Sequence, residues 1–227
     1  MFGKDIQEKE KRSLAAVATG IYAALAVFYF LPPDIPGKIA LPVALLAAFS
    51  FRILPWMMCL ALTASALGDF MGAFDNFMGQ IEFFALAHLC LIVFFVHRWF
   101  HDRNAFSRAG GRQPEHSLWR IIVIGLAVLA VLASAIVAIV VHVPAGVVRV
   151  CVAFYAVVIC MMLFCALIQK SRAYAAAAIL FVFSDALIGW NAFVGPVPGE
   201  RYLIMVPYYL AQLTFFLRAA HVRLSFA

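Results

Sequence analysis

Eight apolar segments follow one another along the whole chain, and proline, glycine or charged residues separate them. A membrane-spanning helix needs about 20 predominantly apolar residues. The hydrophobic fraction of 66% and the charged fraction of 12% differ from the roughly 45–50% and 25% of soluble domains. The pattern excludes a water-soluble globular domain and predicts an all-α polytopic membrane protein with eight transmembrane helices. These helices are expected at 14–31, 38–51, 55–70, 80–96, 119–141, 145–168, 174–194 and 202–220.

The loops carry most of the basic residues, and their distribution predicts the orientation of the chain. Cytoplasmic loops of membrane proteins are enriched in Lys and Arg. If the N-terminus is cytoplasmic, three of the 17 basic residues (Lys38, Arg149 and Arg201) are on the outer side and 14 on the inner side. Both termini are therefore expected in the cytoplasm, in an inner or plasma membrane. The inner residues are Lys4, Lys9, Lys11, Arg12, Arg52, Arg98, Arg103, Arg108, Arg112, Arg120, Lys170, Arg172, Arg218 and Arg223.

The chain is expected to form a single integral membrane domain over residues 1–227. A cytoplasmic segment, 1–13, precedes the first apolar run, and a basic cytoplasmic loop, 97–118, lies against anionic headgroups. The net charge of +6 is thus a topology signal, and no nucleic-acid partner is predicted. All five cysteines lie in apolar runs without metal-ligand spacing, so they are expected to pack as small hydrophobic residues. No cofactor and no metal site are predicted, and membrane lipids are the expected surroundings.

Asp69, His88 and Asp185 are ionisable side chains at membrane depth, and Glu82 and Lys38 lie near the outer ends of their segments. Ionisable groups at membrane depth are costly and mark functional sites by default. Asp69 and Asp185 lie past the middle of segments that run outward, and His88 lies early in a segment that runs inward. All three are therefore expected in the outer half of the bilayer. A site built from them is the main functional hypothesis.

Uncharged polar side chains are expected in the same layer. Tyr208 and Gln212 are four residues apart and share a helix face, as do Ser65 and Asp69. Polar groups at this depth line a buried pocket or join helices to one another, and both interpretations stay open for the serines and Asn191. The candidate substrate-binding residues are Tyr208, Gln212, Ser184, Lys38, Tyr22 and Asn191. Lys38 is interpreted either as a ligand of a lipid phosphate or as a lysine that snorkels to the membrane surface.

The two aspartates lie in similar short sequences. Gly68-Asp69-Phe70-Met71 and Ser184-Asp185-Ala186-Leu187 are 116 residues apart, and each closes the third segment of a four-segment half. These two matches are compatible with a four-plus-four parallel repeat.

The ordered set of motifs resembles the YhhN-like lysoplasmalogenase family. The set comprises Ala66-Leu67-Gly68-Asp69, His88, the segment 178–187 that ends in Ser184-Asp185-Ala186-Leu187, and Tyr208-Tyr209-Leu210-Ala211-Gln212, and Lys38 matches a lysine of the family. The chain departs from the family pattern at Ile39, Glu82 and Leu91, where proline, glycine and tyrosine are usual.

The resemblance implies an enzyme that hydrolyses the vinyl ether bond of lysoplasmalogens, a class of lysophospholipid, to a fatty aldehyde and glycerophospho-ethanolamine or -choline. Such a bond breaks after protonation of its outer alkene carbon, through an oxocarbenium ion to which water adds. An acid and a carboxylate are needed, as in glycosidases. Asp69 and Asp185 are predicted as that catalytic pair, with His88 orienting one of them or carrying a proton.

Two other functions are compatible with the same residues. Intramembrane Asp and His also occur in proton-coupled transporters, although the proline and glycine residues here lie mainly at segment ends, apart from Pro42 and Pro207. A zinc-dependent intramembrane lipid hydrolase usually gathers several histidines, and only His88 lies deep in a segment.

Overall fold

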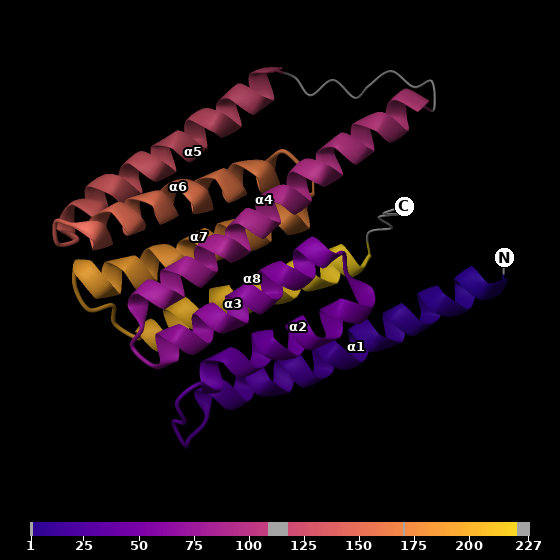
Figure 1. Ribbon diagram of the computed structural model, residues 1–227, viewed down its shortest axis with the longest axis horizontal. Coiled ribbons are helices and arrows are strands. Elements are labelled where there is room, and N and C mark those ends of the chain that lie inside the picture. Colours follow the sequence, from indigo (N-terminus) through magenta and orange to yellow (C-terminus); the bar gives the residue numbers. More distant parts are fainter. Residues whose placement is uncertain (1, 109–117, 170, 222–227) are drawn as a thin grey trace. The chain divides into compact units, whose positions relative to one another are not determined.

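A computed structural model describes residues 2–108, 118–169 and 171–221 of the 227. Eight α-helices account for almost all of these residues, and no strand occurs in the described part, which confirms the all-α fold (Figure 1). The helices are α1 (Phe2–Phe30), α2 (Leu41–Ile53), α3 (Trp56–Ala73), α4 (Phe77–Arg108), α5 (Leu118–Ala138), α6 (Val147–Leu167), α7 (Arg172–Phe193) and α8 (Glu200–Ala220), with short 3-10 helices η1 (Lys38–Ala40) and η2 (Val140–His142).

Proline and glycine set most of the helix boundaries where the sequence predicts them. Pro55 is the N-cap of α3, and proline also occupies the first turn of α2, where its missing N–H removes no helical hydrogen bond. Gly37 precedes η1 with a φ of 80°, in the left-handed region that glycine tolerates best. Ser171 caps α7 by accepting a hydrogen bond from the Tyr174 N–H.

Two helices are longer than the apolar pattern predicts. α1 begins at Phe2, so residues 2–13 of the expected segment 1–13 are part of the helix, and α4 continues to Arg108 through about half of the expected loop 97–118. Residues 109–117 of that loop lie outside the described residues. The added residues are polar and charged rather than apolar, and Lys, Arg, Glu and Gln are good helix formers. The apolar pattern therefore predicted the part of each helix that suits lipid. It did not predict the polar extensions at the start of α1 and the end of α4.

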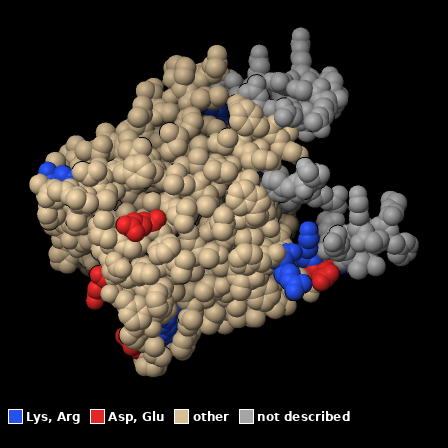
Figure 2. All heavy atoms as spheres, viewed as in Figure 1, with Lys and Arg blue, Asp and Glu red and all other residues tan. Residues whose placement is uncertain are grey.

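Among the described residues, seven helices are long and apolar enough to cross a membrane. α2 is the exception, since its 13 residues extend only about 20 Å at 1.5 Å per residue, against a hydrocarbon core of about 30 Å. Charged side chains are sparse on the face shown in Figure 2. Large apolar side chains such as Val27, Leu126 and Leu129 are exposed, as a lipid-facing surface requires. The chain is an integral membrane protein.

The contacts divide the chain into two compact units, and the single integral membrane domain stays a prediction. Unit 1 comprises residues 1–90 and 209–227, and unit 2 comprises residues 91–208. In unit 1, α2 packs against both α1 and α3; in unit 2, α6 packs against both α5 and α7. Large buried side chains fill both units, among them Leu46 and Leu62 in the first and Phe94 and Phe181 in the second. The four-plus-four repeat stays a prediction.

Candidate functional site

The predicted site residues divide between the two units. Unit 1 contains Tyr22, Lys38, Asp69, His88 and Gln212, and unit 2 contains Ser184, Asp185, Asn191 and Tyr208.

Asp69 lies on the buried face of α3 in unit 1. Only 3% of its surface is exposed, and Ser65, one turn earlier, is 1% exposed. The two residues share a face because they are four apart on a helix, as the sequence predicts. Tyr22 of α1 is buried, and its phenol is close enough to Asp69 for the carboxylate to act on it electrostatically. A carboxylate and a phenol thus lie near each other in an apolar surrounding.

Two tyrosines connect three parts of unit 1. The Tyr22 hydroxyl donates to the Tyr209 carbonyl of α8 at 2.7 Å, and the two rings meet edge to face with centroids 6.1 Å apart. The Tyr209 hydroxyl in turn donates to the carbonyl of Ile39 in η1 at 2.8 Å. These bonds join the neighbourhood of Asp69 to the residue next to Lys38.

Lys38 is buried inside unit 1, with 4% of its surface exposed. Its ammonium group donates to the carbonyls of Leu31 and Pro33, in the connection that follows α1, and lies 4.3 Å from the centroid of the Phe28 ring. The snorkelling interpretation is wrong, because a snorkelling lysine extends its ammonium group into water. Lys38 instead ties the connection between α1 and α2 to η1. Contact with a lipid phosphate stays a prediction.

His88 and Gln212 complete the predicted residues of unit 1. His88 lies in α4 with no exposed surface, and Gln212 lies in α8 with 2% exposed. Both side chains interact with neighbouring groups. All five predicted site residues that lie in this unit are therefore buried.

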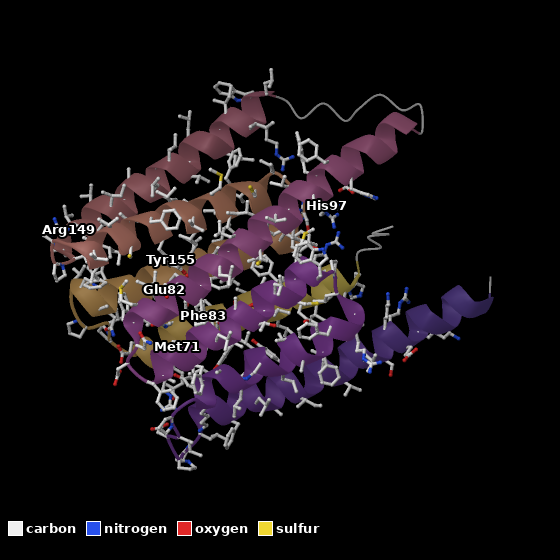
Figure 3. All side chains as sticks on the ribbon, viewed as in Figure 1. Met71, Glu82, Phe83, His97, Arg149 and Tyr155 are labelled. Carbon is white, nitrogen blue, oxygen red and sulfur yellow. The ribbon has the colours of Figure 1, made fainter. Side chains whose placement is uncertain are left out.

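Asp185 lies in α7 of unit 2 and is 8% exposed. Its Oδ2 atom accepts a hydrogen bond from the hydroxyl of Tyr155 in α6, the residue labelled in Figure 3. The sequence pattern did not predict Tyr155 as a site residue. One tyrosine between Phe154 and Ala156 resembles ordinary apolar packing, and the sequence contains no signal for the facing carboxylate.

Three other predicted residues of unit 2 have identifiable local partners. The Ser184 hydroxyl donates to the Ile204 carbonyl of α8 at 2.9 Å, near Pro207, and the Asn191 Oδ1 accepts the Val197 N–H at 2.9 Å. The Ser184 bond links α7 to α8, and the Asn191 bond holds the connection between these helices against the end of α7. Contact of either side chain with a substrate stays a prediction. Tyr208 is buried and packs edge to face against Phe181, with centroids 5.3 Å apart.

An apolar groove of about 610 Å³ runs over α2 in unit 1. The groove has room because four of the residues that line it are alanines: Ala40, Ala44, Ala47 and Ala66. Thr63 and Lys38 are polar residues that line it. Asp69 does not line this groove. The groove therefore offers hydrophobic contact at a place separate from the carboxylate.

Within the described ranges, no three His, Cys, Asp or Glu side chains lie close enough together to hold a metal ion.

A family model described as the YhhN family matches residues 37–219, most of the chain and all but one of the predicted site residues. This chain belongs to the YhhN family. Besides this family match, 36 residues are 47% identical to lysoplasmalogenase TMEM86B of Sus scrofa. That match covers only 16% of this chain and 16% of the relative. No solved structure is significantly similar to the chain.

Proposed function

We propose that this YhhN family member is a lysoplasmalogenase. Its substrate is a lysophospholipid with one vinyl ether chain, and its products are a fatty aldehyde and glycerophospho-ethanolamine or -choline. The observation that carries the proposal is family membership over residues 37–219, and the 36-residue match to a lysoplasmalogenase supports it. An integral membrane protein suits this substrate, because the chain of a lysophospholipid is dissolved in the bilayer.

The reaction requires two carboxyl groups in different protonation states. A protonated carboxyl transfers its proton to the outer alkene carbon of the vinyl ether, which leaves an oxocarbenium ion on the carbon bonded to oxygen. An ionised carboxylate stabilises that cation and removes a proton from the attacking water. The resulting hemiacetal then collapses to aldehyde and alcohol. Glycosidases use two carboxyl groups at a similar transition state.

We assign these roles to Asp69 and Asp185. Both are buried in helices that have few other charged side chains, and a carboxylate is costly to bury without a purpose or a partner. Asp69 belongs to unit 1 and Asp185 to unit 2, and their joint action is the hypothesis to be tested. His88 orients one carboxyl group or carries a proton in this scheme.

The remaining residues have supporting roles in the proposal. Tyr22 and Gln212 hold the water or the glycerol hydroxyl, together with Tyr208, and Lys38 contributes positive charge toward the lipid phosphate. Ser184 holds α7 against α8 through its bond to Ile204, and Asn191 orders the connection after α7 through its bond to Val197.

The test is aldehyde release from lysoplasmalogen by purified protein in detergent, without any ion gradient. Asp69→Asn and Asp185→Asn are each expected to lose at least about 10²-fold in kcat, the lower end of what acid–base catalysis contributes. Asp75→Asn is the matched control. Asp75 is exposed, and its φ of 57° is a conformation that asparagine adopts readily.

Three outcomes would contradict the proposal. Wild-type rates from either variant would remove that aspartate from the mechanism. Inactive wild-type protein that moves protons across vesicles would favour a transporter. Activity lost in chelator and restored by zinc would favour a zinc hydrolase.

A further inference from the structure

Tyr155 lies in α6 and contacts Asp185 of α7. α6 and α7 pack against each other within unit 2, and the Tyr155 hydroxyl donates to Oδ2 of Asp185 (Figure 3). Its neighbours along α6, from Val152 to Val158, are otherwise apolar. The hydroxyl therefore points to a specific partner rather than to a polar surface.

A hydrogen bond from a hydroxyl to a carboxylate has two physical properties. It is stronger than a bond between two neutral groups. It also fixes the direction of the carboxylate plane. Because a carboxylate has about four acceptor positions, the bond from Tyr155 leaves others for water or substrate.

We propose that Tyr155 is the positioning residue that orients the Asp185 carboxylate, and that Asp185 is the group which stabilises the oxocarbenium ion and activates water. Asp69 is then the proton donor. This inference rests on the function proposed above, and it divides roles between two aspartates that the sequence leaves equivalent.

The alternative is that the bond only holds α6 against α7. Removal of the hydroxyl would then change stability and leave the catalytic constants alone. Kinetic constants and thermal unfolding, measured on the same variants, separate the two roles.

The first experiment measures kcat, KM and the unfolding temperature of Tyr155→Phe in the full-length purified protein. We expect kcat to fall about 10–100-fold, the range that one hydrogen bond to a charged group supports. KM should change less than about twofold, since the bond acts on the carboxylate and not on lipid binding. Tyr174→Phe is the matched control, because Tyr174 is a buried tyrosine of α7 in the same unit, eleven residues before Asp185. It should keep the wild-type kcat.

Two results of this experiment would overturn the proposal. A lower unfolding temperature with unchanged kcat would show a purely structural bond. A loss in Tyr155→Phe as large as in Asp185→Asn would make Tyr155 itself the catalytic group.

The second experiment measures binding without turnover, with a single-chain phospholipid that carries a protonated amine in place of the vinyl ether. The cation imitates the charge of the oxocarbenium ion, so it should bind the ionised carboxylate. Asp185→Asn should weaken binding at least about tenfold and Tyr155→Phe several-fold, while Asp69→Asn keeps wild-type affinity.

Weakened binding in Asp69→Asn and normal binding in Asp185→Asn would reverse the assignment of roles. Wild-type protein that does not bind the amine would also contradict the inference. Absence of vinyl ether turnover by the wild type, in contrast, would refute the proposed function independently of this binding measurement.

Discussion

At the scale of single residues, two buried charged groups have uncharged hydrogen-bonding partners. Lys38 donates to two backbone carbonyls, and Asp185 accepts from a phenol. A buried charge is tolerated only where hydrogen bonds replace those it had with water. A substitution that removes one partner leaves the other buried without its hydrogen bond. The free energy lost is then larger than the net contribution of the bond itself.

Lys38→Met is expected to destabilise the protein. Methionine keeps much of the side-chain length but removes the donors, so the carbonyls of Leu31 and Pro33 lose their bonds. The expected loss is about 1.5–3 kcal/mol, typical of hydrogen bonds to a charged group. Thermal unfolding in detergent checks it. Lys9→Met, at an exposed position of α1, is the control and should unfold at the wild-type temperature.

Unchanged unfolding of Lys38→Met with a raised KM would contradict the structural role and favour contact with the lipid phosphate. A lower unfolding temperature with unchanged KM would remove Lys38 from substrate binding.

The sequence predicted which ionisable residues are buried, and it missed what they contact. Asp69, His88 and Asp185 stood out because charge is expensive at membrane depth. Tyr155 did not, since a tyrosine in an apolar helix carries no such cost. The bonds of Ser184 and Asn191 to backbone groups depend on the approach of α8 and the loop before it, which no local pattern encodes.

At the scale of helices, a glycine lets α3 and α4 approach closely within unit 1. A Cβ atom added at Gly68 would lie 3.0–3.3 Å from the ring of Phe84. Small residues at helix contacts are typical of membrane proteins, where close packing rather than the hydrophobic effect joins helices. Gly68 directly precedes Asp69, so this close contact between α3 and α4 lies next to the buried carboxyl group.

Gly68→Leu is expected to destabilise the protein by about 1–3 kcal/mol, as overpacked cores are. Gly20→Leu is the matched control, because no atom lies within 4 Å of a Cβ added at Gly20. Thermal unfolding of both variants in the same detergent makes the comparison. Equal unfolding temperatures would show that Phe84 moves aside without cost and would contradict the close contact.

Helix boundaries were predictable where the backbone itself sets them. Proline and glycine mark the starts of η1, α2 and α3. The early start of α1 and the late end of α4 were not predictable, since their charged turns have the composition of a loop. Neither η1 nor η2 was predicted, because three-residue helices have no periodic pattern.

At the scale of the whole molecule, the distribution of basic residues predicts the orientation in the membrane. We propose that all eight helices, the short α2 included, cross the membrane, that both termini lie in the cytoplasm and that the buried polar residues lie in the outer half of the bilayer. The connections before α6 and before α8, around Gly146 and Gly199, are then on the outer side.

An epitope inserted after Gly146 should bind antibody in intact cells, and an epitope at either terminus should bind only after permeabilisation. Immunofluorescence on the same cells reads both positions. Terminal epitopes that bind antibody in intact cells would reverse the orientation.

The fold class and the family followed from sequence, and the division into two units did not. The membrane class of the protein and the number of α-helices follow from hydropathy, which is local. The division depends on which helices contact each other, and α4 and α8 each contribute residues to both units. For the same reason, the sequence identified the two aspartates without assigning their separate roles.

The most direct test of the central claim is the isotope content of the aldehyde released in D₂O. If a carboxyl group protonates the outer alkene carbon, the fatty aldehyde, trapped at once and analysed by mass spectrometry, should carry one deuterium on the carbon next to the carbonyl. Its amount should equal that of the glycerophospho product, and Asp69→Asn should release almost none. Aldehyde without deuterium, or no aldehyde from the wild-type protein, would contradict hydrolysis by intramembrane acid–base catalysis.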